Sequence, residues 1–160
     1  MTPLKTGTKA IVTNSDKGGS SGTAFTLTDN KIAVKKITVW VDNGSGGYSD
    51  RKLVKAIKLD WTDGKERERG NKTGTSYSFE FDDNEKVDSL DLWTGDRVDR
   101  IKLTTDGGRT FDHGGMDYTG GKGGTKHSEE VGNGILLGFD GRADSNELIS
   151  LGAVFKEDSD

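Results

Sequence analysis

The apolar residues of this 160-residue chain fall in short β-branched and aromatic runs, and helical spacing never persists beyond two turns. Typical runs are Ile37–Val41, Tyr77–Phe81 and Ala153–Phe155. Turn-forming dipeptides such as Asp63-Gly64 and Asp106-Gly107 separate the runs. Many short strands joined by frequent turns predict an all-β protein with negligible helix, built as an antiparallel barrel, sandwich or prism.

One apolar pattern, V-x-x-[I/L]-x-[V/L], recurs along the chain. Four clear copies begin at Val34, Val54, Val87 and Val98; a relaxed copy begins at Leu148 and a degenerate one at Gly134. The copies group as three pairs of neighbouring strands, and a glycine-rich loop ending in Gly-Thr precedes each pair. These loops span residues 18–23, 70–75 and 120–125.

The glycine-rich loops divide the chain into three pseudo-repeats, residues 18–69, 70–119 and 120–156. The third is shorter than the other two because it lacks the strand that should lead into the next loop. Residues 1–17 contain the apolar stretch Lys9–Thr13, which can supply that strand. The sequence therefore predicts one closed threefold domain over residues 1–160, whose N-terminal strand completes the last sheet.

Composition narrows the classes of function. Cysteine is absent, which excludes a disulfide framework, a thiolate metal site and a cysteine nucleophile. A formal net charge of −4 argues against nucleic acid as a partner, since no basic excess exists to displace counterions. No apolar run approaches the roughly 20 residues of a membrane span. No signal-peptide pattern is visible, which favours a cytoplasmic or non-classically secreted protein.

The most specific motif lies near the C-terminus, where Leu137–Arg142 is followed by Glu147–Phe155. This stretch is similar to the G-F-x-G-R-S-G-x-x-I-D-x-L-G ending of the jacalin-related lectins. The resemblance extends over essentially the whole chain and is also carried by Gly18–Phe25, Ile57–Leu59, Ile101–Leu103 and Arg109–Phe111. It implies a β-prism I fold, three four-stranded antiparallel sheets about a pseudo-threefold axis, and sugar binding without catalysis, metal or cofactor.

A sugar site needs a carboxylate that accepts hydrogen bonds from hydroxyls, backbone N–H groups that donate hydrogen bonds, and little steric bulk. The mannose-binding branch of the resembling family uses a G-x-x-x-D loop beside a glycine-rich loop of the neighbouring repeat. One complete match, Gly95-Asp96-Arg97-Val98-Asp99, lies in the turn between two repeated strands. The resemblance pairs this loop with Gly120, Gly121 and Gly124. We expect Asp99 to accept sugar hydroxyls and to matter little for folding; the alternative is a plain polar turn with Asp99 on a strand face.

The other two units depart from that pattern. In the third unit the position of the family aspartate is Ile149, so another polar residue of the loop would have to replace it. The candidate residues there are Gly141, Asp144, Ser145, Asn146 and Glu147, opposite Gly18, Gly19 and Gly22. In the first unit the aligned residue is Lys55, and the long loop 42–50 offers Tyr48 as a stacking platform.

Other chemistry is not indicated. His113 and His127 lack zinc-ligand spacing, and no nucleophile elbow exists. The expected partners are mono- or oligosaccharides and glycoproteins, with a homo-oligomer as one route to useful avidity. An alternative function is a protein-interaction or targeting module, for example of a pore-forming toxin, with partly decayed sugar sites. Ile149 and Lys55 favour that alternative.

Overall fold

The computed structural model describes residues 11–115 and 124–157, which form three antiparallel sheets. The first sheet has the order β6-β5-β4-β7 and contains β4 (Val34–Asn43), β5 (Lys52–Trp61), β6 (Glu66–Gly70) and β7 (Thr75–Glu80). The second has the order β10-β9-β8-β11 and contains β8 (Val87–Thr94), β9 (Val98–Thr105), β10 (Thr110–Gly114) and β11 (Thr125–Ser128). The third contains β3 (Thr23–Thr28), β12 (Leu136–Ala143) and β13 (Leu148–Lys156), with the two short strands β1 (Ile11–Thr13) and β2 (Lys17–Gly18) along the free edge of β13.

The N-terminal strand completes the third sheet, as the sequence predicts. Val12 on β1 pairs with Phe155, and Gly18 on β2 pairs with Ser150, so the two short strands share one edge position. Asn14 lies between them and is buried. Its amide nitrogen donates to the carbonyl of Ala153 at 2.9 Å, which ties the break between the two strands to β13.

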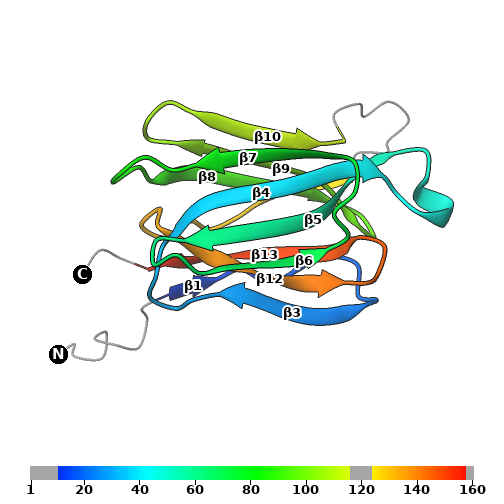
Figure 1. Ribbon diagram of the computed structural model, residues 1–160, viewed down its shortest axis with the longest axis horizontal. Coiled ribbons are helices and arrows are strands. Elements are labelled where there is room, and N and C mark those ends of the chain that lie inside the picture. Colours follow the sequence, from blue (N-terminus) through cyan, green and yellow to red (C-terminus); the bar gives the residue numbers. More distant parts are fainter. Residues whose placement is uncertain (1–10, 116–123, 158–160) are drawn as a thin grey trace.

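The all-β prism of three four-stranded sheets is confirmed, and the only helical element in the described residues is the 3-10 turn η2 (Gly46–Tyr48). Figure 1 shows strands of all three sheets running along the long axis of the molecule, with β10 on one side and β3 on the other. Within the described part of the chain, no helix has the length and apolar character needed to cross a membrane.

The sheets are offset by one strand from the sequence units. Each strand that follows a glycine-rich loop pairs with a strand of the preceding unit: β3 with β12, β7 with β4, and β11 with β8. Every sheet is therefore assembled from two units, and each glycine-rich loop joins strands on the two opposite edges of one sheet: β2 to β3, β6 to β7 and β10 to β11.

The apolar pattern fills the core, and its three-residue interval has a structural cause. A β-bulge lies inside this interval, so that residues three apart both face the interior. The bulges of the first strands fall between Val34 and Lys36, between Val87 and Ser89, and between Leu136 and Gly138. The sixth copy therefore runs from Leu136 to Phe139, both buried, and not from Gly134 as the sequence suggested.

Candidate functional site

Three connections between central strands meet at one end of the prism, here called the loop end. They are residues 44–51 between β4 and β5, residues 95–97 between β8 and β9, and residues 144–147 between β12 and β13. The first connection carries η2 and projects on the right in Figure 1. Side chains of all three connections contact one another, which places the sequence-predicted loops in one neighbourhood.

A second bulge occupies the start of the second strand of each central pair. The extra residues are Lys55, Asp99 and Ile149, and all three are buried. Because a bulge turns one side chain out of the alternating pattern, it gives each sheet the same special position near the loop end. That position holds a cation in the first sheet, a carboxylate in the second and an aliphatic group in the third.

Asp99 is only 1% exposed, so it is not the surface residue expected from a turn. Its Oδ1 atom is buried and accepts no hydrogen bond from the described residues. Burial raises the pKa of Asp99 to about 6, against the opposing effects of the Arg51 charge and a hydrogen bond from the backbone N–H of Gly95. A buried acceptor without a donor costs free energy, and such a group is expected where a ligand supplies the donor.

Gly124 forms the wall next to this carboxylate. Its φ of +76° is a left-handed conformation, and a β-carbon at this position would lie 2.5 Å from Oδ2 of Asp99. Glycine is therefore required here both by the backbone and by the close approach. Gly120 and Gly121, the other predicted members of this wall, lie outside the described residues.

The turn 95–97 presents its backbone outward. Gly95 and Asp96 are exposed, whereas Val98 is fully buried in the core. The Tyr48 hydroxyl donates to Oδ2 of Asp96 at 3.2 Å, and the Tyr48 ring lies 4.6 Å from the guanidinium carbon of Arg97. Tyr48, which the sequence assigns to a first-unit site, therefore contacts the second-unit loop.

Sequence reasoning missed a buried ionic cluster, here called the Glu147 network. The side chain of Glu147 is fully buried, and its carboxylate lies 2.7 Å from Arg97 Nε and 3.2 Å from Lys55 Nζ. The backbone N–H and hydroxyl of Ser45 also donate to it, at 3.1 to 3.2 Å. Protein donors thus engage both oxygens of the carboxylate considered for a third-unit sugar site. A lysine at a core-facing position in β5 was the available signal, since a buried lysine requires a partner.

The remaining third-unit residues lie in two adjacent loops. Oδ1 of Asp144 accepts from the backbone N–H groups of Asn146 and Glu147, which closes the β12–β13 turn. Ser145 and Asn146 are exposed, and Gly141 is buried in β12. Three glycines face them, and a β-carbon at any of the three would collide with a backbone carbonyl oxygen. The oxygens are those of Ile149 for Gly18, Asp96 for Gly19 and Ala143 for Gly22. The loops are closely packed, and neither places an unpaired buried carboxylate at this position.

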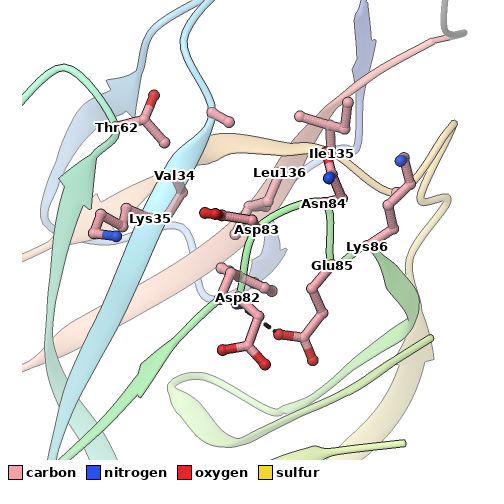
Figure 2. A pocket seen from close by; sticks show the side chains of 13 residues that line it. Val34, Lys35, Thr62, Asp82, Asp83, Asn84, Glu85, Lys86, Ile135 and Leu136 are labelled. Atoms are coloured by element: carbon pink, nitrogen blue, oxygen red, sulfur yellow. Dashed lines mark hydrogen bonds between the residues drawn. The ribbon is translucent and has the colours of Figure 1, made fainter. Parts of the chain in front are cut away.

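A separate cavity of about 240 Å³ lies where β4, β8 and β12 begin. Figure 2 shows the turn from Asp82 to Lys86 along one wall, opposite Val34 and Leu136. Glu85 in this turn is bonded by Arg109, which holds the pKa of that carboxyl down at about 2. In the described residues no three His, Cys, Asp or Glu side chains gather as metal ligands.

Comparisons with known proteins agree on one family. The family model for the jacalin-like lectin domain matches residues 15–154. The structure of a lamprey immune protein is similar with a TM-score of 0.75 and 28% identity, covering 91% of this chain but only 44% of that protein. A banana lectin shares the fold with a TM-score of 0.68 and 22% identity, over 89% of this chain and 96% of that one. A mannose-binding jacalin-related lectin from Ananas comosus does so with a TM-score of 0.70 and 22% identity, over 91% of this chain and 98% of that one. A search of curated protein sequences finds no significant match.

Proposed function

Because the chain belongs to the jacalin-like lectin domain family, we propose that it is a non-catalytic lectin that binds a hexose at the loop Gly95–Asp99. The observation that carries this proposal is the buried Oδ1 of Asp99, which finds no donor within residues 11–115 and 124–157, beside the glycine at position 124. The cost of desolvating this carboxylate is already included in the folded state. Sugar hydroxyls that donate to it would therefore recover free energy.

The proposed binding geometry uses few groups. Asp99 accepts hydrogen bonds from one or two hydroxyls, while the backbone N–H groups of Asp96 and Arg97 donate from the exposed turn. Because Gly124 has no side chain, the sugar ring can approach Asp99 from the other side. The space between Gly124 and Asp99 must widen by enough to admit a hydroxyl. Such a site makes few contacts, so single-site affinity is expected to be on the order of millimolar, about −4 kcal/mol. Several sites in an oligomer would raise the effective affinity.

The description of one relative supports the sugar class that we propose. The lectin from Ananas comosus is described as mannose binding, and its shared fold supports a hexose of the mannose type for this chain. The other two units lack an unpaired buried carboxylate at the bulge, because Ile149 is aliphatic and Lys55 is paired with Glu147. We therefore assign the working site to the second unit.

A titration with methyl α-mannoside followed by NMR tests this assignment. Amide signals of residues 95–99 and 124 should shift in the wild type and stay still in Asp99→Ala. Losing the acceptor should cost roughly 1–3 kcal/mol, which abolishes millimolar binding. Asp83→Ala, which removes an exposed carboxylate from the distant cavity, should bind normally. Shifts confined to residues 18–22 and 141–147 would move the site to the third unit.

A second candidate is a targeting module of a larger protein. The chain spans less than half of the lamprey immune protein, which favours this candidate. Under it the second-unit site would still bind glycans, but on a target surface. The length of the mature protein in its natural source distinguishes the two.

A further inference from the structure

The Glu147 network joins the three connections of the loop end around one carboxylate. Ser45 belongs to the β4–β5 connection, Arg97 to the β8–β9 turn and Glu147 to the β12–β13 turn, while Lys55 is the bulge residue of β5. We propose that Glu147 is a positioning residue for the sugar site at Gly95–Asp99 and that it acts through Arg97. This inference rests on the proposed function of that site.

The charges of the network make Glu147 hard to replace. Its side chain is fully buried between two cations, whose side chains are 6% exposed at Lys55 and 16% exposed at Arg97. Removing the negative charge leaves two poorly solvated cations without compensation, a costly arrangement. Lys55 stays bonded to the carbonyl of Asn43 at 2.8 Å, so Arg97 is the group expected to move.

Arg97 in turn fixes the part of the turn that would donate to the sugar. Its Nη1 atom donates to the carbonyl oxygen of Asp96 at 2.8 Å, and its guanidinium lies over the ring of Tyr48. The Tyr48 hydroxyl donates to the side-chain carboxylate of Asp96, so both the backbone and the side chain of Asp96 are held. The peptide between Asp96 and Arg97 is therefore oriented by a side chain that Glu147 anchors. Binding groups misplaced by about 1 Å lose most of their effect.

The test uses Glu147→Gln with Glu129→Gln as the matched control. Glu129 is also a glutamate with a fully buried side chain, paired with Lys17 at 2.9 Å and bonded by the backbone N–H of Ala153. Neither of these two partners belongs to the loop end. Both variants should lose stability. Only Glu147→Gln should shift the amide signals of Asp96 and Arg97 in the absence of sugar and weaken methyl α-mannoside binding at least tenfold.

Arg97→Gln and the double variant distinguish positioning from general support. If Glu147 acts through Arg97, the double variant should bind sugar as weakly as either single variant. If Glu147→Gln does not fold, Arg97→Gln serves as the test variant instead. Three outcomes would each overturn the inference while leaving the proposed function intact. They are a double variant whose loss of sugar affinity is the product of the two single losses, an equal loss of affinity in Glu129→Gln, and normal sugar binding by Glu147→Gln. A wild-type protein that shows no sugar response would instead remove the proposed function, and the inference with it.

Discussion

The ring of Tyr77 on β7 stacks on the imidazole of His113 on β10, with centroids 3.9 Å apart and planes 13° from parallel. This contact joins the edge strands of the first and second sheets. Phe111 lies against the same imidazole at 4.8 Å, so His113 is enclosed by aromatic rings. Burial lowers the pKa of His113 because the charged form loses solvation there.

That contact predicts a pH-dependent contribution to stability. Below about pH 6.5 the unfolded chain protonates His113 while the folded chain resists, so the free energy of unfolding should fall as the pH falls. His113→Phe keeps an aromatic partner for Tyr77 and removes the titration. Urea unfolding at pH 7.5 and 5.5 should show a smaller loss in this variant than in the wild type, and His127→Gln should behave as the wild type. Equal pH dependence in all three proteins would contradict the prediction.

Asp99 should affect stability with the opposite sign. Its pKa is about 6 in the folded state against an ordinary value of 3.8, so the folded state holds a proton that the unfolded state releases between these values. Stability should therefore decrease as the pH rises from 4 to 6 and then remain level. Asp99→Asn should be more stable than the wild type at pH 7, by up to about 3 kcal/mol, and similar to it near pH 4. Chemical denaturation at both pH values measures the difference, and equal stability at pH 7 would show that the carboxylate is not desolvated.

Gly124→Ala should damage both the fold near the site and sugar binding. The added methyl group would need a left-handed backbone and would meet the Asp99 carboxylate. Gly108→Ala is the matched control, because its φ of +78° imposes similar strain while the space around a new β-carbon is open. Each substitution should cost roughly 1 kcal/mol from the backbone alone. Binding of methyl α-mannoside, measured by NMR, should be lost only in Gly124→Ala; equal binding by both variants would remove Gly124 from the site.

Arg109→Ala should destabilise the turn that lines the separate cavity. Arg109 donates to Glu85 through Nε at 3.0 Å and to the Glu80 carbonyl at 2.8 Å, and its guanidinium lies 4.3 Å from the ring centre of Phe79. The low pKa of Glu85 means that this stabilisation is present above about pH 4.5 and is lost as the pH falls toward 2. At pH 7 the variant should unfold at a lower temperature and a lower urea concentration than the wild type. At pH 2 the difference between the two proteins should shrink, and a difference that stays as large as at pH 7 would assign the effect to the Glu80 carbonyl bond and to packing on Phe79.

The fold could be predicted from the sequence because its repeats share one pattern of apolar residues. The pattern at Val34, Val54, Val87 and Val98 predicts the paired central strands, and all four side chains are buried. The bulges could not be predicted, because a three-residue interval reads equally well as an imperfect alternation. For that reason Asp99 was expected in a turn, near the surface, when it is buried at the bulge.

Only part of the candidate site could be predicted from the sequence. The motif Gly95–Asp99 names a carboxylate and a turn, and the structure gives both, together with the glycine at 124. The Glu147 network was not predictable, because its members come from three connections and from strand β5, which meet only when the prism closes. Glu147 was considered as a sugar acceptor, and its partners Lys55 and Arg97 lie 92 and 50 residues away in sequence.

The pairing of the first strands with the last has a consequence for synthesis on the ribosome. Among the described strands β3 pairs with β12, and Asn14 bonds Ala153 across 139 residues, so the N-terminal strands must wait for strands made much later. The first and second sheets use consecutive strands and can form while the chain is still growing. The strands β1 to β3 remain open edges until β12 and β13 have been made, and during that time a neighbouring nascent chain can offer the same partners. Loss of β13 would leave the edges of β1 and β2 without their partner and would favour aggregation.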